Sequence, residues 1–202
     1  MPTLHLGFLA SHGGSNMQAI INACKHGRLD AIPCAAISNN RDSFALERAR
    51  DERIPSYHLS SRTHPEPEKL DEEILSVLRK HGVDTVILAG YMKRLGPRTL
   101  GAYQGRVLNI HPALLPKYGG KGMYGRFVHE AVLAAGERES GATVHIVTAE
   151  YDQGPIVNQC RVPVYPDDTV ETLSARVLGE EHKLYVETLQ KIANGEIKLE
   201  GT

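Results

Sequence analysis

Two polar side chains lie at the end of an apolar segment, in the stretch NIHPALLPKY that begins at Asn109. The preceding residues, VL, are typical of a buried strand. Side chains two apart on a strand point to the same face, so Asn109 and His111 should lie side by side. Pro112 cannot donate to a sheet and keeps His111 extended, so the strand should end there, at the edge where open α/β sheets bind ligands.

An amide and an imidazole in such a place can carry out acyl chemistry. An amide N–H can donate to an oxyanion, and an imidazole can donate or shuttle a proton. The structural alternative is a histidine satisfied by backbone groups at a strand end, which is the more frequent case for an isolated histidine. The neighbouring Asn109 favours the functional interpretation of His111.

A carboxylate follows in the turn TAEYDQGP, where Asp152 precedes Gln-Gly-Pro. An aspartate in a turn usually caps its own backbone, which is the structural alternative. Close to His111, the Asp152 charge would favour the imidazolium form. Because no plausible serine or cysteine nucleophile accompanies the pair, we expect the substrate to supply the nucleophile.

A second polar segment, SHGGSN, separates the first apolar run from a helical pattern. Gly13 and Gly14 permit a tight turn and a close approach to a ligand. We expect Ser15 or Asn16 to cap the helix, and the helix N-terminus to favour an anion such as a phosphate. A plain turn with an ordinary cap is about equally consistent, since the segment is neither G-x-G-x-x-G nor a P-loop.

Apolar strand-like runs alternate with helical patterns along the chain. Strands are expected over 4–10, 32–38, 56–59, 83–89 and 107–111, and helices over 16–25, 43–52 and 68–80. A helix over 126–135, β segments over 142–147 and 156–164, and a helix from about 169 to 193 follow. We therefore expect an α/β fold: an open, mainly parallel twisted sheet with helices on both faces and one antiparallel segment toward the C-terminus.

The composition is that of an ordinary globular protein. Of 202 residues, 41% are hydrophobic and 23% charged, and the formal net charge of −1 argues against nucleic acid or an anionic membrane as partner. No apolar run reaches the length of a membrane span. Three cysteines without a CxxC pair favour neither disulfides nor a metal site, so we expect no metal and a cytoplasmic location.

Four ordered motifs together resemble one known family: SHGGSNMQAI, ILAGYM, NIHPALLPKY and GATVHIVTAEYDQGP. They resemble the folate-dependent formyltransferases, and among them phosphoribosylglycinamide formyltransferase, over nearly the whole chain. The resemblance implies a Rossmann-like formyltransferase fold in one domain, 1–202, with a nucleotide-binding half (1–100) and a folate-binding and catalytic half (101–202). It implies formyl transfer from 10-formyltetrahydrofolate to the amine of 5'-phosphoribosylglycinamide in purine biosynthesis.

The resemblance also implies residue roles. Asn109 and His111 would stabilise the oxyanion and shuttle the proton, and Asp152 would raise the pKa of His111. The ribonucleotide would be bound by Gly14, Ser15, Asn16 and Glu181. The folate would be bound by Met92, Lys93, Arg94, Leu95, Asn109, Thr148, Ala149, Glu150, Tyr151 and Asp152. From sequence alone Glu181 fits a solvated helix face better, and His145, which matches a family histidine, fits a satisfied strand residue equally well.

The chain departs from the family pattern in two places. The segment GGKGMYG after Tyr118 replaces a shorter, more histidine-rich stretch, so we assign no role to His129. Pro67 stands near the position of an expected basic folate contact, for which Arg62 or Lys69 is a candidate substitute.

Other functions are less consistent with the sequence. Methionyl-tRNA formyltransferase and formyltetrahydrofolate hydrolase share the catalytic trio but normally carry an extra domain. A dinucleotide-binding oxidoreductase would carry G-x-G-x-x-G after the first strand, and a noncatalytic nucleotide-binding module leaves the trio unexplained. We expect small-molecule substrates only, and a monomer or homodimer.

Overall fold

The computed structural model describes residues 3–199, which form a seven-stranded sheet in the order β3-β2-β1-β4-β5-β6-β7. The strands are β1 (Leu4–Leu9), β2 (Ala31–Ser38), β3 (Ser56–His58), β4 (Thr85–Leu88), β5 (Val107–His111), β6 (Glu139–Ile146) and β7 (Ile156–Pro163). The helices are α1 (Ser15–Lys25), α2 (Phe44–Asp51), α3 (Pro67–Lys80), α4 (Pro97–Ala102), α5 (Arg126–Ala134) and α6 (Val170–Ala193).

The sheet is mainly parallel, as predicted. Strands β1 to β5 pair in parallel, whereas β6 is antiparallel to both β5 and β7. Because β7 is antiparallel to β6, it runs in the same direction as β5. Among the strands of residues 3–199, β6 alone runs in the opposite direction, and it is the antiparallel segment expected toward the C-terminus.

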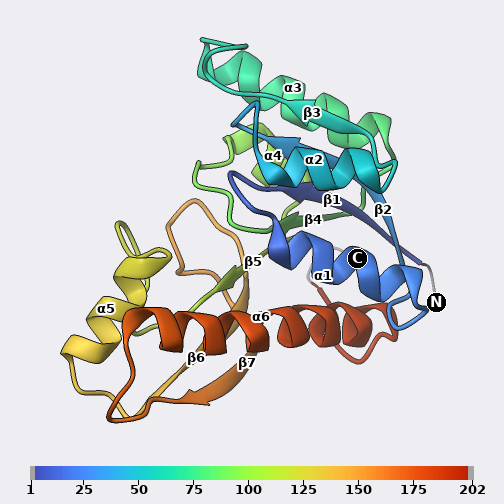
Figure 1. Cartoon of the computed structure of the whole chain (residues 1–202). Coiled ribbons are helices and arrows are strands. Elements are labelled where there is room, and N and C mark those ends of the chain that lie inside the picture. Colours follow the sequence, from blue (N-terminus) through green and yellow to red (C-terminus); the bar gives the residue numbers. More distant parts are fainter. Residues whose placement is uncertain (1–2, 200–202) are drawn as a thin grey trace.

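Helices cover both faces of the sheet (Figure 1). On one face, α1, α2 and α6 bury alternate strand residues such as Leu6, Phe8 and Leu108. On the other face, α3 and the α4 region bury the intervening residues, including Leu9 and Val107. This alternation is the period of two expected when both faces of a strand are covered.

Helix α4 was not predicted, because its stability comes from a residue distant in sequence. Asp71 on α3 accepts hydrogen bonds from the backbone N–H groups of Arg98 (2.8 Å) and Thr99 (3.1 Å). Pro97 occupies the first turn, where the missing N–H has no cost. A six-residue helix is too short to be stable alone, so this tertiary cap decides its position.

The strand order places β1 between β2 and β4. Such a change of direction in the strand order opens a crevice at the carboxyl ends of the strands, where ligands of α/β proteins bind. At this edge lie SHGGSN after β1, the residues around Met92 after β4, and NIHP at the end of β5. Within residues 3–199, no helix has both the length and the apolar character needed to cross a membrane.

Candidate active site

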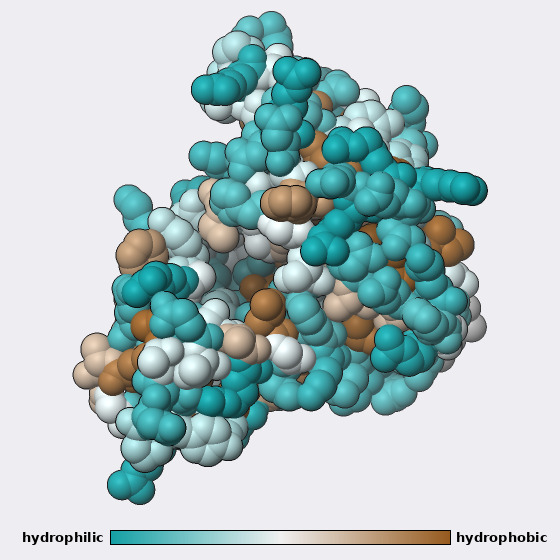
Figure 2. Space-filling model, in the orientation of Figure 1, coloured by the Kyte–Doolittle hydropathy of each residue, from teal (hydrophilic) through white to brown (hydrophobic). Residues whose placement is uncertain are grey.

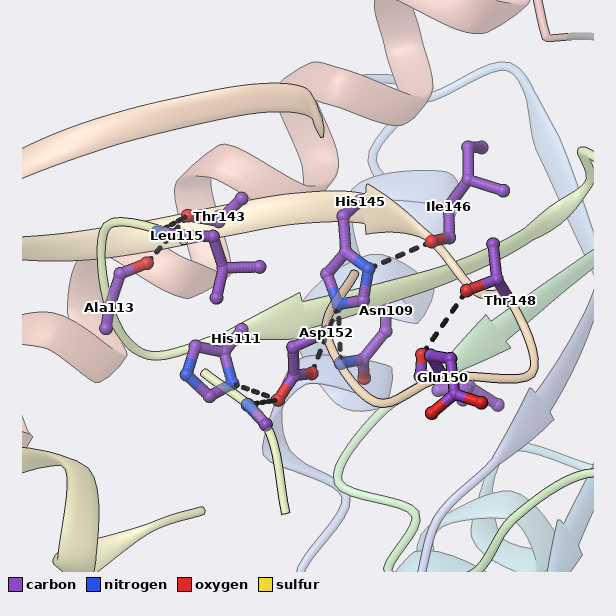
Figure 3. A network of polar contacts seen from close by, with 12 residues as sticks. Asn109, His111, Ala113, Leu115, Thr143, His145, Ile146, Thr148, Glu150 and Asp152 are labelled. Carbon is purple, nitrogen blue, oxygen red and sulfur yellow. Dashed lines mark hydrogen bonds and ion pairs between the residues drawn. The ribbon is translucent and has the colours of Figure 1, made fainter. Parts of the chain in front are cut away.

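Asn109 and His111 lie at the carboxyl end of β5, and both line a cavity of about 780 Å³. Leu108 and Ile110, on the opposite face of the strand, belong to the core under α1 and α6. The predicted shared face of the amide and the imidazole is thus confirmed. Figure 3 shows both side chains directed to the region between β5 and the turn that carries Asp152.

The walls of this cavity come from segments far apart in the sequence. The loop from Gly120 to Gly125 forms one wall, and the turn from Thr148 to Asp152 forms another. Figure 2 shows the surface hollowed between the part of the molecule that carries α3 and the lobe that carries α5. The GGKGMYG segment, in which the sequence departs most from the family pattern, is therefore a part of the site.

The His111 ring is held between two acceptors. Its Nε2 donates to the backbone carbonyl of Tyr118 at 2.7 Å, and its Nδ1 lies 3.6 Å from Oδ2 of Asp152. Burial lowers the pKa of His111 below its ordinary value, and the charge of Asp152 and the Tyr118 carbonyl offset this only in part. Asp152 thus acts on the pKa in the expected direction, but burial outweighs it.

Asp152 is itself fixed by several contacts. Its Oδ2 accepts from the backbone N–H of Gly120 at 2.8 Å, and its Oδ1 lies 3.5 Å from Nε2 of His145. Burial alone would raise the pKa of Asp152, but an N–H on Nε2 of His145, present when that ring is protonated, and the contacts with His111 and Gly120 hold it below its ordinary value. Asp152 also has a left-handed φ of 54°, a strained conformation of the kind that clusters at functional sites.

His145 stands beside Asn109 on the neighbouring strand β6. Its Nε2 is 3.1 Å from Nδ2 of Asn109, and its Nδ1 is 2.9 Å from the carbonyl oxygen of Ile146. The ring is almost completely buried. The sequence left open whether His145 is a structural residue; the structure places it in contact with two of the three candidate catalytic side chains.

The first turn has a different cap from the one expected. The cap residue of α1 is Gly14, with a left-handed φ of 66°, and no side chain caps the helix. A Cβ at Gly14 would lie 2.8 Å from Cβ of Ala45, so α2 packs too closely for a larger residue. The prediction that Ser15 or Asn16 caps the helix is therefore wrong. The first N–H groups of α1 are left for another acceptor.

Asn16 instead points toward α6, where its Nδ2 donates to Oε2 of Glu181 at 2.7 Å. Glu181 is 8% exposed and lines the cavity, so the expectation that it belongs to a solvated helix face is wrong. Burial raises the pKa of Glu181 to about 7, and the hydrogen bond from Asn16 lowers it only in part. A sequence pattern shows which face of α6 is polar, but not which neighbouring segment covers it.

The structure brings together most of the predicted binding residues. All ten candidate folate residues line the cavity, namely Met92, Lys93, Arg94, Leu95, Asn109, Thr148, Ala149, Glu150, Tyr151 and Asp152. Of the candidate ribonucleotide residues, Asn16 and Glu181 line it, whereas Gly14 and Ser15 do not. Within residues 3–199, no group of three or more histidine, cysteine, aspartate or glutamate side chains is arranged to hold a metal ion.

Comparison with known proteins assigns the chain to a family. The profile of the formyl transferase family matches residues 5–189. The chain belongs to the formyl transferase family. Phosphoribosylglycinamide formyltransferase of Escherichia coli is 39% identical to this formyltransferase, over 97% of this chain and 90% of that protein. The chloroplastic enzyme of the same name from Arabidopsis thaliana is 44% identical, over 96% of this chain and 66% of that protein.

The fold of the formyltransferase agrees with solved structures. Glycinamide ribonucleotide transformylase 1 of Symbiobacterium toebii superposes with a TM-score of 0.91 at 39% identity, covering 98% of this chain and 92% of that one. The predicted formyltransferase fold is thus confirmed. A formyltetrahydrofolate deformylase of Pseudomonas syringae shares the fold at 24% identity, over 64% of that chain.

A second cavity of about 1320 Å³ adjoins the first in this formyltransferase. The two share lining residues His12, Tyr91, Lys93, Arg94 and Leu95. Of the two candidate basic substitutes, Arg62 lines the second cavity, whereas Lys69 pairs with Glu66 at 2.7 Å on the surface.

Sequence reasoning missed several groups that shape the formyltransferase site. The Tyr118 carbonyl and the Gly120 N–H are backbone groups, and no residue pattern reveals them. His12, which lines both cavities, lies inside the SHGGSN segment and could have been included with it.

Proposed function

We propose that this formyltransferase transfers the formyl group of 10-formyltetrahydrofolate to the amine of 5'-phosphoribosylglycinamide. The products are phosphoribosyl-N-formylglycinamide and tetrahydrofolate, in de novo purine biosynthesis. The observation that carries the proposal is that Asn109, His111 and Asp152 surround one cavity together with the candidate folate residues and Glu181. The names of relatives that match almost the whole chain support the choice of acceptor.

In the proposed reaction the substrate amine attacks the formyl carbon. A carbon–nitrogen bond forms, the formyl oxygen becomes an oxyanion, and collapse breaks the bond from the formyl carbon to the folate nitrogen. A proton moves from the attacking amine to the leaving nitrogen. Each hydrogen-bond donor aimed at the oxyanion is typically worth about 3 kcal/mol in the transition state.

The contacts of the trio suggest how its members divide this work. Both ring nitrogens of His111 face protein groups, so Asn109 is the donor available to the oxyanion in this conformation. His111 reaches the substrate when it exchanges the Tyr118 carbonyl for a substrate oxygen. The negative charge of Asp152 stabilises the imidazolium through both steps of the proton transfer.

Binding of the far end of the ribonucleotide would position its amine. The uncapped N-terminus of α1 suits the phosphate, and Glu181 suits the ribose hydroxyls, as in the family pattern. Gly14 and Ser15 would contribute backbone N–H groups, which does not require their side chains to line the cavity. Remote binding energy of this kind holds the reacting atoms in place.

The folate would lie between the segment from Met92 to Leu95 and the turn from Thr148 to Asp152. Arg94 spans these two segments, because its guanidinium lies 4.4 Å from the Tyr151 ring centre and 3.8 Å from a Glu150 oxygen. The negatively charged glutamate tail would continue into the second cavity toward Arg62. The division into halves, a cytoplasmic location and a monomer or homodimer remain predictions; some plant relatives are named as chloroplastic.

Incubation with 10-formyltetrahydrofolate, with and without 5'-phosphoribosylglycinamide, tests this proposal. Release of tetrahydrofolate only when the ribonucleotide is present, with one formylated ribonucleotide per folate, is the expected result. Release without the ribonucleotide would indicate a hydrolase instead. Tight ribonucleotide binding without any folate product would indicate a binding module.

A further inference from the structure

The register between β5 and β6 places His145 directly opposite Asn109. Directly opposed residues in antiparallel strands bring their side chains into contact on one face of the sheet. The contact is therefore fixed by backbone pairing, and it joins a strand histidine to the amide predicted to bind the oxyanion. Figure 3 shows the His145 ring over the Asn109 side chain.

The other ring nitrogen of His145 shows where its proton lies. Nδ1 is 2.9 Å from the carbonyl oxygen of Ile146, and a carbonyl oxygen can only accept. Nδ1 must therefore carry the proton, which in the neutral ring leaves a lone pair on Nε2. In this neutral form the ring is buried with Nδ1–H turned toward the backbone, so His145 offers no N–H to a ligand.

An acceptor at Nε2 decides which way the Asn109 amide is turned. Nδ2 of Asn109 is 3.1 Å from Nε2 and donates to it. If the amide turned its oxygen toward this lone pair, two acceptors would face each other. Oδ1 of Asp152 lies 3.5 Å from the same nitrogen, a separation that forms an ion pair only when the ring is protonated, so the amide is the hydrogen-bond partner of the neutral ring. One N–H of the amide is thus held by His145, and the second remains for the cavity.

We propose that His145 is a positioning residue, which in its Nδ1–H form orients the Asn109 amide so that it donates to the formyl oxygen. This inference rests on the proposed formyl transfer. It assigns His145 no contact with either substrate. Its effect should therefore appear in the chemical step and depend mainly on the presence of Asn109.

Replacement of the ring tests the acceptor role. His145→Phe keeps a buried ring but cannot accept, so kcat should fall by about 10- to 100-fold, less than the loss of an oxyanion donor. His145→Gln offers a side-chain oxygen as acceptor, and kcat should recover at least several-fold relative to the phenylalanine variant. The KM values for both substrates should change less than about twofold, because no ground-state contact is lost.

A matched control exists near the amino end of the interior strand β1. His5 is also a strand histidine beside an aspartate, with its Nδ1 3.3 Å from Oδ2 of Asp84, and it lies outside both cavities. His5→Phe should keep wild-type kcat. An increase in ribonucleotide KM at unchanged kcat in His145→Phe would overturn the proposal, because it would indicate a substrate contact.

A double-mutant cycle separates orientation from general damage. In an Asn109→Ala background, His145→Phe should lower kcat by less than about twofold further, since there is no amide left to orient. If the two losses multiplied instead, His145 would act independently of Asn109, and the proposal would be wrong.

A spectroscopic measurement does not require activity. In ¹⁵N-histidine NMR at pH 8, His145 should appear as the neutral form protonated at Nδ1, and the Nε2 signal should shift in Asn109→Ala. A proton on Nε2, alone or with one on Nδ1, would contradict the proposal. If the wild-type protein transferred no formyl group, the proposed function would fail, while this measurement would still report the tautomer.

Discussion

At the scale of single residues, the charge of the His111–Asp152 pair is controlled from two sides. Burial lowers the pKa of His111, whereas Asp152 and the Tyr118 carbonyl favour its charged form. The backbone of the Tyr118–Gly120 segment contacts both members of the pair. The protonated fraction of His111 therefore depends on the loop as well as on the aspartate.

Asp152→Asn should reduce kcat by about 100-fold or more, since the imidazolium loses the carboxylate that stabilises it. The alkaline limb of the kcat profile should also move to lower pH, because the contribution that raises the pKa of His111 is removed. Steady-state kinetics between pH 5 and pH 9 measure both effects. Ribonucleotide affinity should be retained; near-wild-type turnover would refute the assignment of Asp152.

The buried Glu181 should make stability depend on pH. Its pKa is raised from 4.5 to about 7. Between these two pH values the folded protein therefore keeps a proton that the unfolded chain has released. Its contribution to the free energy of unfolding should thus fall as pH rises from about 4.5 to 7. Glu181→Gln should be more stable than wild type at pH 8 by about 1 to 3 kcal/mol.

Urea unfolding of Glu181→Gln and wild type at pH 5 and pH 8 measures this difference. The two proteins should differ less at pH 5, where Glu181 is protonated in the folded state. An equal difference at both values would show that this titration does not control stability.

At the scale of elements, α6 forms side-chain hydrogen bonds to the backbone of the strands that carry the site. Tyr185 is completely buried, and the single proton of its hydroxyl is shared between the carbonyl oxygens of Leu108 at 2.9 Å and Leu88 at 3.2 Å. These carbonyls belong to β5 and β4, immediately before the polar carboxyl ends of the strands. One helix side chain therefore holds the two central strands next to the cavity.

Tyr185→Phe removes this hydroxyl without opening a large space. We expect the free energy of unfolding to fall by about 1 to 2 kcal/mol, the usual cost of a lost buried hydrogen bond. Urea unfolding measures the change. Tyr165→Phe is the matched control, because Tyr165 is 50% exposed and its substitution should have little effect.

The loop after β5 is packed tightly against the site. A Cβ at Gly119 would lie 2.5 Å from Cδ2 of Leu115 and 3.2 Å from Cβ of Asp152. Gly119→Ala should therefore displace Asp152 and lower kcat by about tenfold or more, since a small misplacement is enough. Gly101→Ala, in α4 with open space around the added methyl, serves as control. Wild-type kcat in Gly119→Ala would indicate that the loop rearranges to accept the methyl group without moving Asp152.

At the scale of the whole molecule, charge is distributed unevenly despite the net charge of −1. The second cavity is lined by Arg41, Arg62, Lys93 and Arg94, against the acidic residues Asp42 and Asp71. Asp71 is already engaged by the N-terminus of α4. The cavity therefore carries an excess of positive charge beside the proposed folate site.

Arg62→Gln should raise the KM for a folate with several glutamates by about threefold to tenfold. The KM for the monoglutamate should rise less. An exposed cation interacts only weakly with each carboxylate, so the effect grows with the number of carboxylates. Lys69→Gln, in the first turn of α3 and paired with Glu66, should leave both values unchanged. Initial-rate kinetics at low and at 0.5 M salt measure this, and the difference should shrink as salt screens the charges. Equal changes in KM for Arg62→Gln and Lys69→Gln would argue against binding of the glutamate tail in the second cavity.

The alternation of apolar runs determined the α/β class, the mainly parallel sheet and the shared face of Asn109 and His111. These features follow from local periodicity, which a sequence displays directly. The resemblance to the family supplied Asp152, the folate segment around Met92 and the substrates. Helix α4 was missed because a distant side chain, Asp71, stabilises its first turn. The cap of α1 was missed because the close contact with α2 requires a glycine at position 14.

The sequence by itself therefore determined which residue types reach the carboxyl edge of the sheet, since strand period and a following proline are local properties. Only the tertiary structure decided which of them touch. Three contacts join segments that are separate along the chain. They are the hydrogen bond from Asn16 to the buried Glu181, the contact between Asn109 and His145, and the backbone contact on His111. Protonation and amide orientation depend on such neighbours, so they become defined only when the chain has folded.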